Sequence, residues 1–256
     1  MRQRLHDKLS ADHYSLIQLS APAGYGKSSL IAGWLKENYR VSAWLGLTEN
    51  DNNPHHFWKR LTQTLNYLLP GSGTSSLQRL SSTLPPTIQA ILPTLCRDLH
   101  RIAGNLLMDA PAVLVIDNYQ EITSPIIHSR LLDLINQLPI QLQIVILNRG
   151  ESPFADSQLK AGSLKLSYKD LAFTTEETSE YFKKSTARPS TLSNAIEIAE
   201  YVEGWVAGLQ LIASKIDKQP HELNEILFLK NRKPLVSNLM VETFTAAHPT
   251  LQVFML

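Results

Sequence analysis

A glycine-rich segment, APAGYGKS at 21–28, constrains the fold of this chain more than any other feature. It follows an apolar, β-type run at 15–20 and precedes a stretch at 27–37 in which apolar residues recur at helical spacing. Gly24 and Gly26 allow backbone conformations that other residues avoid. The segment therefore predicts a strand, a tight loop and a helix, with backbone N–H groups that converge on one anion.

Further short runs rich in Val, Ile and Leu predict strands of the same sheet, because strands that are buried on both faces read as continuous apolar stretches. Helical stretches separate them, and Asn53 before Pro54 predicts an N-cap with proline at the first helical position. We expect Pro93 to kink or delay its helix, and the Gly-, Ser- and Pro-rich residues 70–86 to form a surface loop. The predicted strands are 15–20, 41–47, 112–117, 142–148 and 164–167, and the predicted helices between them are 27–37, 54–69 and 87–102.

The strand signal stops after residue 167, and the rest of the chain has helical periodicity. We therefore predict an α/β domain at 1–168, a parallel sheet flanked by helices, followed by a small all-α helical domain at 169–218. A third, incomplete domain is expected at 219–256. The predicted helical segments are 175–184, 192–201, 205–216 and 221–256.

The composition excludes several classes of protein. With 43% hydrophobic and 18% charged residues, the chain has enough apolar side chains for a large core and is not disordered. A net charge of +1 gives no overall field for nucleic acid or an anionic membrane. One cysteine cannot form an internal disulfide, and residues 1–9 contain no apolar run for a signal peptide or membrane span. We expect a cytoplasmic protein that contacts neither nucleic acid nor membrane.

The 21–28 segment fits the Walker A pattern if alanine can replace its first glycine. A chance Gly-Lys pair in an ordinary turn is the alternative, which the strand and helix on either side disfavour. We expect Lys27 to contact the β- and γ-phosphates of a nucleotide and Ser28 to offer its hydroxyl to Mg²⁺. The predicted phosphate-binding residues are Ala21, Pro22, Ala23, Gly24, Tyr25, Gly26, Lys27, Ser28 and, more weakly, Ser29.

Polar residues follow two other predicted strands. Asp117 ends the run AVLVID and is the expected Walker B carboxylate for Mg²⁺. Many related enzymes place a second acid next, but here that residue is Asn118, which can orient a water molecule and cannot take its proton. Glu121 is either a substitute base or a solvated loop acid. Arg149 follows the strand at 142–148 and could sense the γ-phosphate from the carboxyl edge of the sheet.

Taken together, these motifs resemble the ATPase module of MalT-type regulators, the large ATP-binding LuxR-type branch of the STAND nucleotide switches. The resemblance covers almost the whole chain and rests on four segments, of which the second and fourth are absent from P-loop proteins in general. These segments are LIQLSAPAGYGKSSLIAGWL at 16–35, WLGLTENDNNPHHFWKRL at 44–61, VLVIDNYQEI at 113–122 and VEGWVAGLQLIA at 202–213.

The resemblance implies roles for further residues. An aromatic and a DN(D/N)P element are expected to brace the nucleotide domain, and Trp44, Asp51, Asn52 and Pro54 match this element. The LNRGESPF segment at 147–154 resembles the family's sensor element at Arg149. An EGW element, matched here by residues 203–205, is expected to pack near the nucleotide base through Gly204 and Trp205. From the residues alone, Trp205 is more often a core aromatic than a base-stacking one.

The resemblance also sets expectations for what surrounds this module. Residues 234–256 are similar to the opening of a winged-helix domain, so we expect 219–256 to be the start of one and the sensor and DNA-binding domains to be missing. Asn118 departs from the family's Asp–Asp pair, which implies slow or absent hydrolysis. The expected function is an ATP- or ADP-binding, Mg²⁺-dependent switch module of a transcriptional regulator that self-associates or acts with those missing domains.

Two alternatives remain open. The chain could be an active stand-alone ATPase or phosphotransferase, although no second motif predicts an acceptor site. It could instead be a truncated interaction partner of a full-length regulator, which would use the apolar residues Val253, Phe254 and Leu256 at its end.

Overall fold

The computed structural model describes residues 2–11, 14–84, 86–105, 110–154, 159, 162–185 and 202–218. These residues fall into two units. One unit comprises 3–21 and 27–167, and the other comprises 1–2, 22–26 and everything from 168 onward. The predicted helices at 192–201 and 221–256, and with them Val253, Phe254 and Leu256, lie outside the described residues.

A five-stranded parallel sheet forms the centre of the first unit, as predicted. Its spatial order is β2-β3-β4-β1-β5. The three inner strands are mostly apolar and almost entirely buried, whereas the edge strand β2 alternates between buried Ala43 and Leu45 and the exposed Trp44. This difference arises because only inner strands are covered on both faces. The strands are β1 Leu16–Ser20, β2 Ser42–Gly46, β3 Ala112–Asp117, β4 Leu142–Asn148 and β5 Ser163–Ser167.

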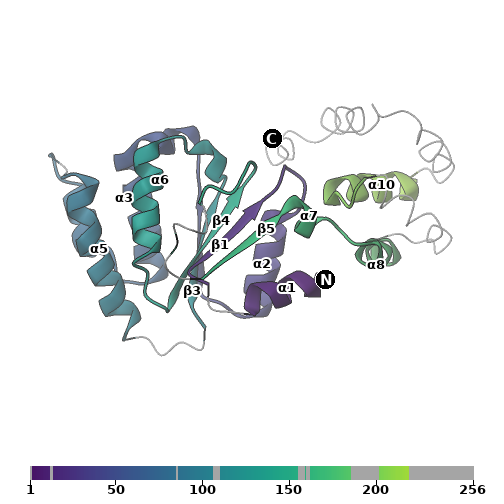
Figure 1. The fold of residues 1–256 in the computed structure, drawn as a ribbon, viewed down its shortest axis with the longest axis horizontal. Coiled ribbons are helices and arrows are strands. Elements are labelled where there is room, and N and C mark those ends of the chain that lie inside the picture. The colour runs from purple at the N-terminus through teal and green to yellow at the C-terminus, as the bar shows by residue number, and fades with distance from the viewer. Residues whose placement is uncertain are drawn as a thin grey trace. The chain divides into compact units, whose positions relative to one another are not determined.

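Helices cover both faces of the sheet (Figure 1). Helices α3 Pro54–Leu68, α5 Ile88–Ala103 and α6 Pro125–Ile135 lie on one face, and α1 Gln3–Ser10 and α2 Lys27–Glu37 lie on the other. On the first face, Leu114 and Ile144 belong to the same buried cluster as Trp58 and Leu95. Helix α3 begins as predicted, with Pro54 as its first residue and the Asn53 side chain accepting a hydrogen bond from the backbone N–H of His56 at 3.0 Å.

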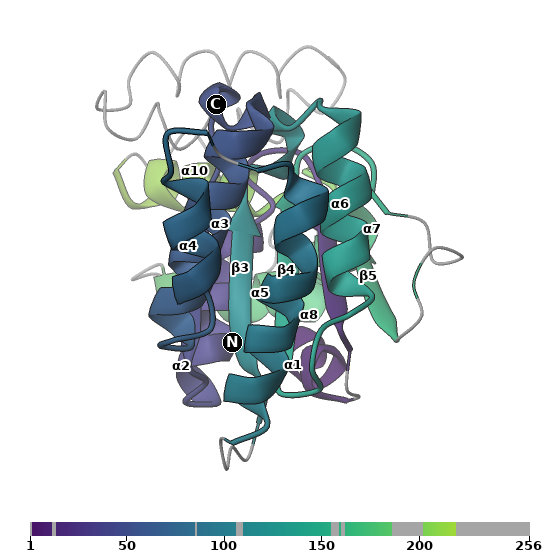
Figure 2. The same ribbon diagram turned by 90° about the vertical axis from the view of Figure 1, so that its left-hand side faces the viewer.

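Three features of this unit differ from the predictions. Residues 70–86 contain a helix, α4 Thr74–Leu80, which lies with α5 and α6 in front of the sheet in Figure 2. It is held there by Leu80, which is buried in the same core. Pro93 lies inside α5, which begins at Ile88, so of the two expected effects of Pro93 the delay of the helix does not occur. The buried residues of α5 offset the cost of about 3 kcal/mol for an internal proline. Helices α1 and α6 were not predicted.

The described part of the second unit consists of helices joined by turns and loops, together with the loop residues 22–26. It contains α7 Tyr168–Leu171, α8 Thr175–Ser185 and α10 Val206–Lys218. Helix α8 starts with a reciprocal cap, because the Thr174 hydroxyl accepts from the N–H of Glu177 and the Glu177 carboxylate accepts from the N–H of Thr174. Phe182 of α8 and Leu209 and Ile212 of α10 form the buried apolar cluster. No helix in the described ranges is long and apolar enough to span a membrane.

Candidate functional site

The glycine-rich loop leaves the sheet at the end of β1 and enters α2 at Lys27. Because the sheet is parallel, the carboxyl ends of β1, β3 and β4 share one edge, where ligands of open α/β sheets bind. The N–H of Ala21 donates to the carbonyl of Asn148 at 3.2 Å, which joins the end of β1 to the end of β4. Asp117 and Arg149 emerge at this same edge, at the end of β3 and directly after β4.

The first turn of α2 contacts the end of β3 through side chains. The Ser28 hydroxyl donates to Oδ2 of Asp117 at 2.9 Å. Hydroxyl and carboxylate oxygens are ligands that Mg²⁺ prefers, and Mg²⁺ commonly takes only one or two protein oxygens, with phosphate and water completing its shell. In the described ranges, no group of three or more His, Cys, Asp or Glu residues is placed to hold a metal. By its oxygen donors, the Ser28–Asp117 pair fits a magnesium ion that is shared with phosphates.

Lys27 lies among other charges at this edge. Its ammonium donates to the carbonyl of Ala21 at 2.6 Å. Burial and the positive charge of Arg149 lower the pKa of Lys27 to about 8, and the Asp117 carboxylate opposes part of this shift. Lys27 and Arg149 thus place two cations beside the Asp117 carboxylate, an arrangement that favours an anion.

The segment after Asp117 places a further polar group that the sequence reasoning missed. The side-chain Nε2 of Gln120 donates to Asn118 Oδ1 and to Glu121 Oε1, both at 3.4 Å. Its side-chain Oε1 accepts from the backbone N–H of Arg149 at 3.2 Å. Gln120 thus joins the loops after β3 and β4. Nothing in the loop sequence distinguishes Gln120 from an ordinary solvated side chain, so the sequence alone could not predict its contact with Arg149.

Asn118 adopts a left-handed backbone conformation, with φ 58° and ψ 44°. Asn and Asp tolerate this region better than other non-glycine residues do. The N–H of Asn118 donates to the Asp117 carboxylate at 2.8 Å, and the Glu121 carboxylate lies against Gln120. A second residue without a sequence signal is Asn148, a buried side chain whose carbonyl oxygen has no hydrogen-bond partner within the described part of the chain.

Asn52 connects the loop after β2 with the loop after β3. Its side-chain Nδ2 donates to the backbone carbonyl of Glu121 at 2.6 Å. Its side-chain Oδ1 accepts from the backbone N–H groups of Thr123 at 2.7 Å and Ser124 at 3.2 Å. These bonds fix the backbone that follows Asp117. The resemblance implied a bracing role for Asn52, and these hydrogen bonds to the loop after β3 are the contacts through which Asn52 would act.

Asp51, the neighbouring residue of the same element, is fully buried. Its Oδ2 accepts from the N–H of Thr48 at 2.8 Å and from Arg60 at 2.5 Å, and the second guanidinium nitrogen of Arg60 donates to the carbonyl of Gly46 at 2.8 Å. Asp51 therefore organises the short helix η1, Glu49–Asn52, at the carboxyl end of β2.

The middle of the glycine-rich loop belongs to the second unit, where it meets the start of α10. Gly24 and Gly26 have φ angles of +79° and +74°, which L side chains rarely adopt. The Trp205 indole N–H donates to the carbonyl of Ala23 at 3.0 Å. The Tyr25 ring packs edge-to-face with Tyr168, with ring centroids 6.1 Å apart.

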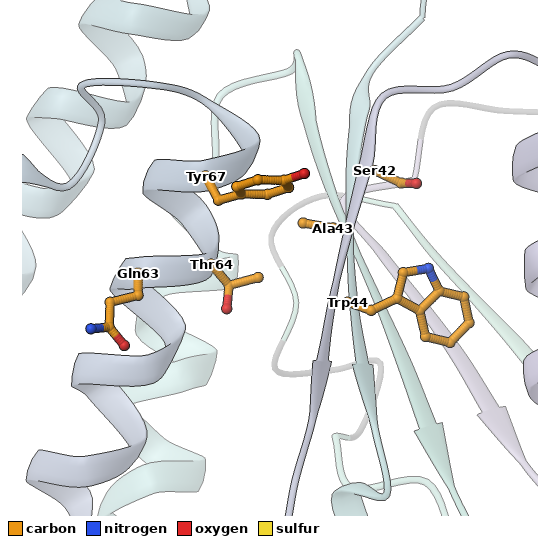
Figure 3. Close-up of a pocket in the computed structure, with 6 residues that line it drawn as sticks. All are labelled: Ser42, Ala43, Trp44, Gln63, Thr64 and Tyr67. Atoms are coloured by element: carbon orange, nitrogen blue, oxygen red, sulfur yellow. The ribbon is translucent and has the colours of Figure 1, made fainter.

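A surface groove of about 450 Å³ lies beside the edge strand β2. It is bounded by α3, whose Tyr67 points toward the strand in Figure 3. None of the predicted phosphate or metal residues lines it, so we do not assign it to the candidate site. The lining residues are Ser42, Ala43, Trp44, Gln63, Thr64 and Tyr67.

The sheet order, the loop after β1 and the carboxylate after β3 define a P-loop ATPase fold. Solved structures agree. The chain superposes on a Walker-type ATPase of Pyrococcus abyssi with a TM-score of 0.55 and 16% identity, covering 96% of this chain and 76% of that one. It also superposes on a chain of the Drosophila ORC bound to DNA with a TM-score of 0.52 and 10% identity, covering 98% and 65%.

Sequence comparison confirms the resemblance to MalT-type regulators. The chain is 33% identical over 224 residues to the HTH-type transcriptional regulator MalT of Yersinia pestis, covering 86% of this chain and 24% of the regulator. It is 30% identical over 216 residues to MalT of Cronobacter sakazakii, covering 83% and 23%. The chain thus spans about a quarter of the length of these curated relatives. No family model matches it.

Proposed function

We propose that this chain is a nucleotide-binding switch module of a MalT-type transcriptional regulator, which binds ATP or ADP with Mg²⁺ and turns ATP over slowly or not at all. The observation that supports it most directly is the 2.9 Å contact between Ser28 and Asp117, which lies directly beside Lys27. In P-loop proteins the serine and the carboxylate share the magnesium ion, and the lysine contacts the β- and γ-phosphates.

The binding chemistry follows from the arrangement at the end of the sheet. The N-terminus of α2 presents backbone N–H groups and a positive helix dipole, both of which favour a phosphate. Lys27 and Arg149 add two positive charges, and Arg149 is attached to the β3 loop through Gln120. An added or lost γ-phosphate would therefore alter the interactions of a residue that is tied to a second loop, which suits a switch.

Slow hydrolysis follows from the acid–base groups. A base that takes a proton from water is best provided by a carboxylate or an imidazole near the attacking water. Asn118 has no such capacity, and the Glu121 carboxylate is engaged by Gln120 at 3.4 Å. We therefore propose that bound ATP persists long enough to define a distinct state of the protein.

The binding proposal is tested by titrating the purified chain with ATP, ADP and AMP in a calorimeter, with Mg²⁺ and with EDTA. We expect ATP and ADP to bind more tightly with Mg²⁺, and AMP to bind much more weakly because it lacks the β-phosphate that the loop holds. Equal affinity for AMP and ADP, or no heat with any of the three nucleotides at millimolar concentration, would reject the proposal.

The lowered pKa of Lys27 predicts proton uptake on binding. At pH 8 about half of the Lys27 side chains are neutral in the free protein, since the pKa is about 8. The phosphate charges raise this pKa again, so binding of ADP should take up about half a proton at pH 8 and almost none from this group at pH 6.5. The number of protons follows from calorimetry in Tris and in HEPES, whose ionisation enthalpies differ.

Lys27→Arg is the matched variant for this experiment, because the guanidinium stays charged at both pH values. We expect the uptake at pH 8 to disappear in this variant while ADP still binds. Uptake that is unchanged in Lys27→Arg would assign the proton to another group.

A second prediction concerns turnover. Asn118→Asp should raise the rate of phosphate release from ATP by about tenfold or more, because it supplies the missing carboxylate without losing the residue's tolerance for the left-handed backbone. Phosphate release is measured under conditions of saturating ATP, with Asn118→Ser as the control that alters the side chain without adding a base. A rate that stays unchanged with ATP binding intact would show that Asn118 does not limit hydrolysis.

A further inference from the structure

Two carbonyl groups in the middle of the glycine-rich loop accept hydrogen bonds from the start of α10. The indole N–H of Trp205 donates to the Ala23 carbonyl, and the backbone N–H of Ala207 donates to the Gly24 carbonyl, both at 3.0 Å. All four residues lie in the same unit. The loop carbonyls are thus paired from outside the loop, by donors about 180 residues further along the chain.

These bonds determine where two loop N–H groups point. A trans peptide is planar, and its N–H lies opposite to its C=O. With the Ala23 carbonyl held by Trp205, the N–H of Gly24 points away from α10. Because the Gly24 carbonyl is held by Ala207, the N–H of Tyr25 also points away from α10. Backbone N–H groups are the donors with which such loops bind phosphate, so the start of α10 orients two of them.

The indole is itself fixed in place. The residues before it form a tight turn, in which Glu203 and Gly204 have φ angles of 49° and 69°, and the N–H of Trp205 donates to the carbonyl of Val202 at 2.8 Å. The carbonyl of Gly204 accepts from the N–H of Phe173 at 2.9 Å. The turn therefore attaches Trp205 to the segment between α7 and α8.

Two glycines provide the space that the indole occupies. A Cβ atom on Gly24 would lie 2.5 Å from Nε1 of Trp205, and one on Gly208 would lie 2.6 Å from its Cε3. Only 8% of the surface of Trp205 is exposed, so little of the ring is available for a nucleotide base to stack on. The indole N–H donates to the loop instead.

We propose that Trp205 is a positioning residue for phosphate binding, which acts by holding the Ala23 carbonyl so that the loop N–H groups are preset toward the anion. This inference rests on the proposed nucleotide binding. It differs from the base-proximal role that the resemblance implied, because the contact it identifies is with the loop backbone. It also gives the helical segment a direct means to respond to phosphate, since movement of α10 would release both carbonyls.

The test compares Trp205→Phe with the unaltered chain and uses three probes in the same calorimetric experiment: ADP, inorganic pyrophosphate and adenosine. Phenylalanine keeps an aromatic ring and loses the N–H donor together with the second ring of the indole. We expect ADP and pyrophosphate to bind about fivefold more weakly, by the same factor, because one neutral hydrogen bond is removed. Adenosine binding should not change. If pyrophosphate affinity stays the same, or if ADP and adenosine weaken together, the inference is wrong and Trp205 contacts the base.

Three controls separate the possible causes. Trp34→Phe makes the same chemical change at another buried indole, whose N–H donates to the hydroxyl of Ser10, and should leave all three affinities unaltered. Ala207→Pro removes the second donor within the first turn of α10, where proline is tolerated, and should weaken pyrophosphate binding even if Trp205→Phe does not fold. If the unaltered chain binds neither ADP nor pyrophosphate, the proposed function fails together with this inference, whereas normal binding that is insensitive to both variants rejects this inference alone.

Discussion

Lys27→Ala should weaken the binding of ATP and ADP at least about 100-fold, which corresponds to about 2.7 kcal/mol. The variant removes the ammonium that contacts two phosphate groups, and a hydrogen bond to a charged group is worth about 1.5 to 3 kcal/mol. The fold should survive, because the Lys27 side chain makes its hydrogen bond to the loop carbonyl of Ala21 and is not part of the apolar core. Calorimetric titration with Mg-ATP and Mg-ADP measures the effect.

Lys36→Ala is the matched control for this experiment. Lys36 is an exposed residue in the last turn of the same helix, so its loss changes the net charge equally without touching the loop. We expect its affinity to stay within about twofold of the unaltered chain, since exposed charges are screened by salt. Equal affinities in the Lys27→Ala variant and the unaltered chain would remove Lys27 from the phosphate site and leave the binding proposal without its main cation.

Asp51→Ala should lower the free energy of unfolding by about 3 kcal/mol, because breaking a buried ion pair leaves its partners unpaired. Asp51 is fully buried and accepts from Thr48 and Arg60, and His56 Nδ1 lies 3.2 Å from its other oxygen. Denaturant unfolding monitored by circular dichroism gives the value. Glu49→Ala, an exposed acid in the same short helix, should change stability by less than about 0.5 kcal/mol.

The effect of Asp51 depends on pH in a defined direction. Burial alone would raise the pKa of Asp51, but the hydrogen bonds from Arg60 and Thr48 outweigh burial and lower the pKa from its usual value of 3.8. The stabilisation is therefore complete above the unfolded pKa and is lost as the pH falls through the folded value. The difference between the unaltered chain and Asp51→Ala should stay constant from pH 7 to about pH 4 and shrink below it. A difference that grows on acidification would contradict this account of Asp51.

The local elements were largely predictable because their signals lie in consecutive residues. Continuous apolar runs such as 112–117 identified the inner strands, and Asn53 before Pro54 identified the start of α3. Helix α4 was not predictable, since its Gly-, Ser- and Pro-rich surroundings favour a loop and its stability comes from tertiary contacts such as the burial of Leu80 and the hydrogen bond from Arg79 to the carbonyl of Ala90. Pro93 shows the same principle, because packing outweighs a local preference.

The sequence by itself predicted the strand–loop–helix unit around residues 21–28 and singled out Lys27, Ser28 and Asp117 as candidate site residues, since glycines, a lysine and an apolar strand that ends in a carboxylate follow one another along the chain. Only the tertiary structure decided which polar groups meet. Asn52 contacts residues about 70 positions away, and Trp205 contacts Ala23 from 182 positions away. Such pairings depend on how the elements pack, and a hydrogen bond between distant residues leaves no periodic pattern in the sequence.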